Sequence, residues 1–228
     1  MIALWYTEAG KYKVFPLDSR GSVRATDERP QLAEERKTYV YYPGTQAVPE
    51  NVAARVLNRA HSITADVEIP KGGGEGVLIS HGSNEGGYSF FIKDKKLHYV
   101  HNYVDVAEYH VESKQSLPEG KAQLRLEFEP MGKPDLAKGK GAPGRVQLYI
   151  NGKLTGQADF PVTIPLLIGI TGGLTVGRNT GSPISHLYAS PFPFTGTIYK
   201  VTIDVSGKMT QDLHEEKKAM AKAATARQ

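Results

Sequence analysis

A run of alternating apolar and polar residues at 58–103, broken repeatedly by glycines, constrains the fold of this chain more than any other feature. Ile63, Ala65 and Val67 alternate with polar residues, and a proline and glycine turn at 70–74 ends the segment. Alternation with period two places apolar side chains on one face of a strand. The run therefore predicts antiparallel strands joined by tight turns.

The same pattern continues toward the C-terminus, and no helical segment interrupts it. Asn151-Gly152 is the strongest short hairpin signal in the chain. Ten or eleven short strands without intervening helices predict an all-β, two-sheet antiparallel sandwich of the concanavalin or laminin-G jelly-roll type. The expected strands are 38–42, 62–69, 76–81, 88–93, 97–103, 108–113, 123–129, 146–150, 154–160, 174–178 and 197–205.

The two ends of the chain differ from the middle. Residues 1–36 are expected to be an N-terminal extension, with a short helix at 2–12 and a polar connection from Ser19 to Arg36. The β-sandwich domain is expected at 37–206. The tail at 207–228 is rich in Ala, Lys and Glu, and it predicts a weakly packed helix or a disordered end.

Composition limits the classes of function. The chain has no cysteine, so it has no thiol nucleophile and no Cys-ligated zinc or iron–sulfur cluster. The tail holds five basic and three acidic residues and so supplies +2 of the net charge of +4. The remaining body is nearly neutral, which disfavours nucleic acid as a partner. No segment predicts a membrane span or a signal peptide. A cytoplasmic location is the default expectation, and periplasmic or secreted locations stay open.

The seven histidines give no metal motif in the sequence. His98 and His101 are three apart in an expected strand and so point to opposite faces. No His-x-x-x-His or Glu-x-x-His pattern is present, and no zinc or di-iron site is predicted. Glu127 and Glu129 lack the spacing of a glycosidase pair and are interpreted as the solvent face of a strand. Nucleophile-elbow and phosphate-loop motifs are absent.

One set of strand residues predicts a ligand-binding face. Tyr99, His101 and Tyr103 share one face of their strand, and Tyr88 belongs to a similar alternation in the preceding strand. Tyrosine and histidine on a sheet face suit the recognition of sugars or proteins, because their rings stack and their polar tips orient a ligand. The alternative is that tyrosine simply favours strands.

Five ordered blocks resemble the C-terminal region of bacterial type I arylsulfatases, over nearly the whole chain except the tail. That region follows the catalytic domain of the family and resembles a concanavalin or laminin-G sandwich. The blocks are Tyr12–Arg20, Thr38–Gly44, Asn58–Pro70, Gly74–Leu78 and Val176–Pro183.

The chain departs from the family where activity is concerned. The family's reactive residue lies in Cys/Ser-x-Pro-x-Arg, and the nearest segment here, Ser116–Gly120, has glycine in place of arginine. The paired metal-binding aspartates of the family also have no counterpart. We therefore expect no sulfate ester hydrolysis by this chain alone. Its expected role is to complete or support a sulfatase catalytic domain. The alternative is a free-standing carbohydrate-binding module.

Two further expectations concern partners and ions. Ile2, Leu4, Trp5 and Phe15 correspond to the last elements of the catalytic domain in the resembled family, so they predict an exposed patch that binds that domain or a second copy. No cofactor is predicted. Calcium binding is left open, because laminin-G-like sandwiches often hold one ion at a rim. Oxygen donors suited to it are Asp66, Asn102, Asp105 and Asn179.

Overall fold

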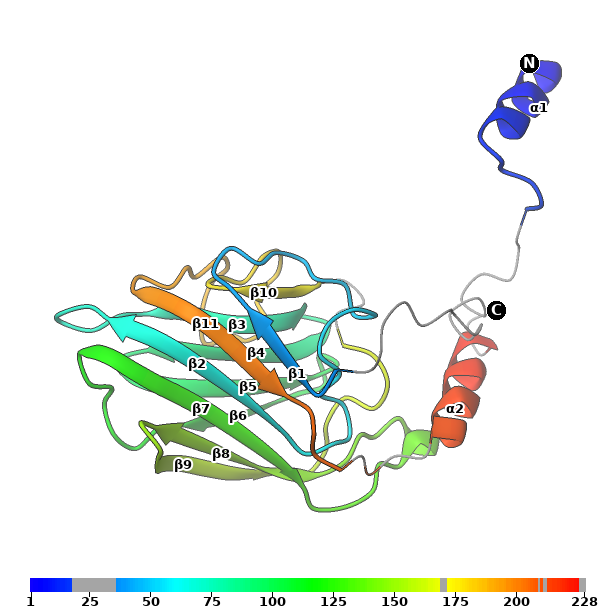
Figure 1. Cartoon of the computed structure of the whole chain (residues 1–228). Helices are drawn as coiled ribbons and strands as arrows, with labels where there is room; N and C mark the ends of the chain where they lie inside the picture. Colours follow the sequence, from blue (N-terminus) through cyan, green and yellow to red (C-terminus); the bar gives the residue numbers. More distant parts are fainter. Residues whose placement is uncertain (18–35, 169–171, 209, 211–212, 226–228) are drawn as a thin grey trace.

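The computed structural model describes residues 1–17, 36–168, 172–208, 210 and 213–225. Its strands form two antiparallel sheets that stack face to face (Figure 1). The prediction of an all-β, two-sheet antiparallel sandwich is confirmed. The first described strand begins at Thr38 and the last ends at Asp204. Most of the expected connection from Ser19 to Arg36 lies outside the described residues.

Six strands form the larger sheet, in the order β1-β11-β2-β7-β8-β9, with every neighbouring pair antiparallel. Its alternating burial follows from the sequence alternation, because every second side chain faces the other sheet. The strands are β1 (Thr38–Tyr41), β2 (His61–Ile69), β7 (Gly120–Pro130), β8 (Gly144–Ile150), β9 (Lys153–Phe160) and β11 (Thr197–Asp204).

Five strands form the second sheet, in the order β10-β3-β4-β5-β6. Tight turns join β3 to β4 and β4 to β5, and Asp94 and Lys95 adopt the positive φ angles of a two-residue hairpin turn. The strands are β3 (Gly76–Ser83), β4 (Gly86–Lys93), β5 (Lys96–Tyr103), β6 (Ala107–Glu112) and β10 (Leu174–Val176).

The main core lies between the two sheets. Ile63, Leu126 and Leu148 are paired across three neighbouring strands and are completely buried. They meet Phe90 and Leu97 of the other sheet in one hydrophobic cluster. Burial of each such side chain contributes about 1.5–3 kcal/mol to the stability of the fold.

A loop at 177–194 covers the outer face of β3 and β4, so these two strands are buried on both faces. Tyr188 from this loop packs with Phe91 and Val100 in a second hydrophobic cluster. Its hydroxyl lies 2.9 Å from Ser89 Oγ and 2.9 Å from Asn179 Oδ1. Buried polar groups are normally satisfied in this way, so the network fixes the loop on the sheet.

The helix α1 (Ile2–Lys11) agrees with the expected N-terminal helix and lies apart from the sandwich (Figure 1). The tail forms α2 (Leu213–Thr225), which lies near the short 3-10 helix η2 (Leu136–Lys138). Glu216 of α2 is buried and forms an ion pair with Arg55. The tail helix is thus better anchored than the sequence indicates. Among the described helices, none is long and apolar enough to cross a membrane.

Candidate functional site

The residues expected to form a ligand-binding face point into the sandwich. Tyr88, Tyr99 and His101 are 1%, 4% and 5% exposed, and both tyrosines belong to the main core cluster. Tyr99 packs against Phe160 of the opposite sheet. The structure therefore does not bear out an open face there: the alternation correctly groups these side chains, but the second sheet covers them.

The polar atoms of His101 and Tyr103 are used in hydrogen bonds within the fold, and the buried Tyr88 hydroxyl has no hydrogen-bond partner among the described residues. Ile164 N–H donates to His101 Nε2 at 3.0 Å, and Tyr103 OH donates to the Gly139 carbonyl at 2.7 Å. Tyr88 and His101 line a cavity of about 20 Å³. Such a space holds about one water molecule and is far too small for a sugar.

The N-terminal apolar residues are exposed, as expected. Ile2, Leu4, Trp5 and Phe15 are all at least 45% exposed. The indole of Trp5 meets the ring of Phe15 with centroids 5.4 Å apart, and Tyr6 packs beside both. The rings thus cover one another only in part.

An open groove of about 490 Å³ lies at one end of the six-stranded sheet. Glu68 near the end of β2 and Thr197 at the start of β11 line it, and its other polar side chains are Lys71, Glu119 and Thr195. Gly196 allows the chain to pass β2 closely, since a Cβ there would lie 2.5 Å from the Glu68 backbone oxygen. The volume is within the range of small-ligand sites.

Tyr199 stands beside this groove. A β-bulge between Ile198 and Lys200 makes Tyr199 the extra residue of its strand, and its side chain is turned outward, with the residue 44% exposed. Bulges commonly redirect a side chain in this way. The hydroxyl donates a hydrogen bond to the Glu68 carboxylate, which raises the pKa of Tyr199. Lys121 Nζ lies 5.8 Å from the ring centroid.

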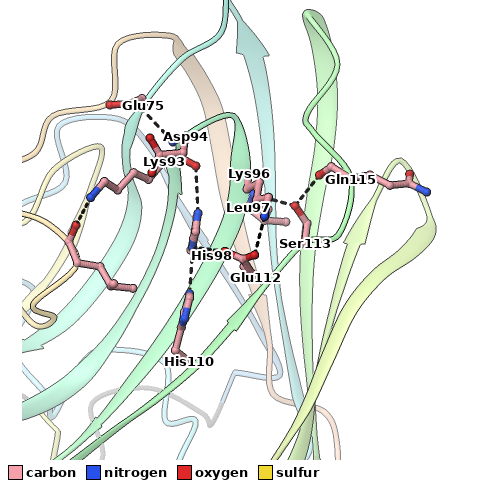
Figure 2. A network of polar contacts seen from close by, with 11 residues as sticks. Glu75, Lys93, Asp94, Lys96, Leu97, His98, His110, Glu112, Ser113 and Gln115 are labelled. Carbon is pink, nitrogen blue, oxygen red and sulfur yellow. Dashed lines mark hydrogen bonds and ion pairs between the residues drawn. The ribbon is translucent and has the colours of Figure 1, made fainter.

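A cluster of two histidines and a glutamate lies on the outer side of the five-stranded sheet (Figure 2). His98 of β5 is paired with Glu112 of β6, and His110 lies two residues along β6 on the same face. His98 Nδ1 is 3.0 Å from His110 Nε2 and 4.0 Å from Glu112 Oε2. In the part of the chain that the structure describes, no other trio of His, Asp or Glu could hold a metal ion.

Burial lowers the pKa of His98, and it also lowers the pKa of the more exposed His110. Lys96 donates a hydrogen bond to Glu112 at 2.6 Å, which lowers the pKa of that carboxyl. At neutral pH the cluster therefore combines two uncharged imidazoles with one carboxylate.

This cluster was not predicted from the sequence, because its residues lie on two different strands and form no local histidine motif. A signal was present: once 97–103 and 108–113 are taken as a hairpin, its register brings His98, His110 and Glu112 together. The proposed calcium donors are not gathered in this way. Asp66 lies on the six-stranded sheet, whereas the Asn102 and Asn179 amides bind loop backbone.

Comparison with known proteins identifies no family. No family model and no curated protein matches the chain. Among solved structures, the chain is similar to the CBM40 domain of a Ruminococcus gnavus IT-sialidase, with 14% identity over 81% of this chain and 97% of that one, at a TM-score of 0.48. The same domain bound to α2,3-sialyllactose matches with 15% identity, 72% and 83% coverage and a TM-score of 0.45.

A botulinum neurotoxin serotype D binding domain is also similar, with 10% identity over 80% of this chain and 42% of that one, at a TM-score of 0.45. These similarities are too weak to indicate a function. The class that the structure itself defines is a two-sheet antiparallel β-sandwich with an open polar groove at one end.

Proposed function

We propose that this chain is a non-catalytic binding domain that holds carbohydrate in the groove beside Tyr199. The observation that carries the proposal is the outward-facing Tyr199 ring at a bulge, which lies beside a groove of about 490 Å³ because its hydroxyl donates to Glu68 of the groove lining. An accessible aromatic ring next to convergent polar groups suits a sugar, whose faces are apolar and whose rim is hydroxylated.

The charges of the groove favour a neutral sugar. Glu68 and Glu119 line it together with Lys71, and Lys121 lies beside the ring of Tyr199. Two carboxylates and two ammonium groups supply both acceptors and donors for hydroxyl groups without a net charge. We therefore expect neutral oligosaccharides to bind at least as well as sulfated or sialylated ones.

The test is calorimetric titration of the full chain with neutral oligosaccharides, their sulfated forms and sialyllactose. Tyr199→Ala should weaken binding roughly tenfold, because about 1.4 kcal/mol is a typical contribution of one aromatic ring contact. Tyr149→Ala is the matched control, since Tyr149 lies on the same sheet with Arg125 4.5 Å from its ring centroid, but outside the groove. Equal losses in both variants, or no binding by the folded protein, would refute the proposal.

The exposed aromatic cluster of α1 supports a second candidate function, a supporting domain that docks on a sulfatase catalytic domain. Trp5 and Phe15 are half-exposed rings that a partner could bury, and the sequence blocks described above resemble the region that follows such a domain. Co-purification with a catalytic domain carrying Cys-x-Pro-x-Arg tests it. Binding that survives Trp5→Ala with Phe15→Ala would contradict this docking mode, whereas carbohydrate binding in the groove would be unaffected.

A further inference from the structure

We propose that His98, His110 and Glu112 form a binding site for a divalent transition-metal ion, with Zn²⁺ as the reference ion. The site lies on the outer side of β5 and β6, whereas the groove lies at the end of the other sheet. It is therefore independent of the proposed carbohydrate function. Imidazole nitrogens and a carboxylate oxygen are the ligands that zinc takes from a chain without cysteine.

The spacing of the donor atoms suits such an ion. His98 Nδ1, His110 Nε2 and a Glu112 carboxylate oxygen all lie within 4.8 Å of one another. Two ligands bound at 2.0–2.1 Å in tetrahedral geometry are separated by roughly 3.3 Å. The separation of the two histidine nitrogens, 3.0 Å, lies just below that value, whereas the 4.0 Å from His98 Nδ1 to Glu112 Oε2 lies clearly above it. Small side-chain rotations of the exposed His110 and Glu112 would equalise these distances.

His98 is held in the form that binds a metal. Its Nε2 lies 3.0 Å from the Lys93 carbonyl oxygen, which can only accept, so Nε2 carries the proton (Figure 2). In the neutral ring, Nδ1 therefore keeps its lone pair, and it points to His110. A backbone carbonyl that fixes the second nitrogen is the usual outer partner of a metal-bound histidine. Phe91 stacks on the ring at 5.0 Å between centroids and limits its rotation.

Lys96 opposes the binding of a cation. Its Nζ lies 2.6 Å from Glu112 Oε1, which leaves Oε2 as the oxygen nearer to His98. A positive charge so close to a divalent ion weakens the binding of that ion. With three protein ligands, a fourth tetrahedral position remains for water or for a carboxylate or imidazole of another molecule.

The test is calorimetric titration of the EDTA-treated, untagged full chain with ZnCl₂ at neutral pH. We expect one saturable site per chain, and Co²⁺ should give the intense visible absorption of a tetrahedral complex. His110→Ala and Glu112→Gln alter exposed side chains on a sheet edge and should leave the fold intact. Each should weaken binding by more than roughly 100-fold, the upper end of what the loss of an outer partner costs.

The matched control is His186→Ala. His186 Nδ1 lies 2.5 Å from Glu108 Oε1, so it forms an exposed histidine–glutamate pair without a second histidine. This variant should bind Zn²⁺ like the unchanged protein. Lys96→Met should bind roughly three- to tenfold more tightly. The inference is overturned if the folded protein shows no saturable binding, if binding survives His110→Ala, or if His186→Ala abolishes it equally.

Discussion

Acidification should destabilise this fold most strongly through His101 and His61, and burial lowers the pKa of His98 and His110 in the same direction. Burial lowers the pKa of His101 to about 3 and of His61 to about 4. Both line the small internal cavity between the sheets. His101 Nε2 accepts the Ile164 N–H, so protonation of that nitrogen would break a buried hydrogen bond. The unfolded chain, in contrast, protonates its histidines near pH 6.5.

The sign and size of the effect follow from this difference. Between the folded and unfolded pKa values the unfolded chain binds more protons, so the stabilising contribution is complete above about pH 6.5 and is lost as the pH falls. At pH 5 each of these two histidines, His101 and His61, lowers the free energy of unfolding by about 2 kcal/mol, and the two together lower it by about 4 kcal/mol. That is a large share of the roughly 5–15 kcal/mol that stabilises a typical domain.

The buried His81 should add little to this loss. His81 Nε2 lies 3.6 Å from Glu50 Oε2, and burial lowers the pKa of His81 to about 4 while it raises the pKa of Glu50 to about 7. The folded pair therefore holds one proton near pH 5. The unfolded pair also holds about one, on the histidine, so the two effects nearly cancel.

The assay is urea unfolding at pH 7.5, 6.5, 5.5 and 5.0. His101→Gln should reduce the slope of stability against pH near pH 5 by about 1.4 kcal/mol per pH unit, the equivalent of one proton. His186→Ala, which removes an exposed side chain, is the control for any effect of substitution itself. A stability that stays constant between pH 7.5 and pH 5 would refute the reasoning.

Two further predictions concern the loop at 177–194 and the N-terminal helix. Tyr188→Phe should lower the free energy of unfolding by about 1–3 kcal/mol, because Ser89 and Asn179 lose a buried partner; a urea midpoint no lower than that of Tyr12→Phe, an exposed control, would contradict this. Trp5→Ala with Phe15→Ala should change the thermal stability of the sandwich by less than about 0.5 kcal/mol, because α1 lies apart from it. A marked drop in the melting temperature would show that these rings pack on the sandwich.

Most of the fold was predictable because local chemistry determines it. The alternation in 62–69 determines which side chains of β2 are buried, and the turns at Asp94-Lys95 and Asn151-Gly152 adopt the expected positive φ angles. Each of the eleven expected strands has a counterpart in the structure.

The position of the site was less predictable, because alternation groups side chains without showing what covers them. Tyr88 and Tyr99 share a face as expected, but the opposite sheet buries it. The other face of β4 is also covered, because Tyr188, about a hundred residues later, packs on it. The bulge at Tyr199 was not predicted, although the spacing of Ile198, Val201 and Ile203 breaks the period-two alternation at that point.

The most direct test of the account is an amide and side-chain chemical-shift map of the full chain titrated with a neutral oligosaccharide. Binding in the groove predicts saturable shifts at Glu68, Thr195, Thr197 and Tyr199, and no comparable shifts on β5 and β6. Shifts centred on another surface, or none at saturating sugar, would contradict the proposal that this sandwich is a carbohydrate-binding domain.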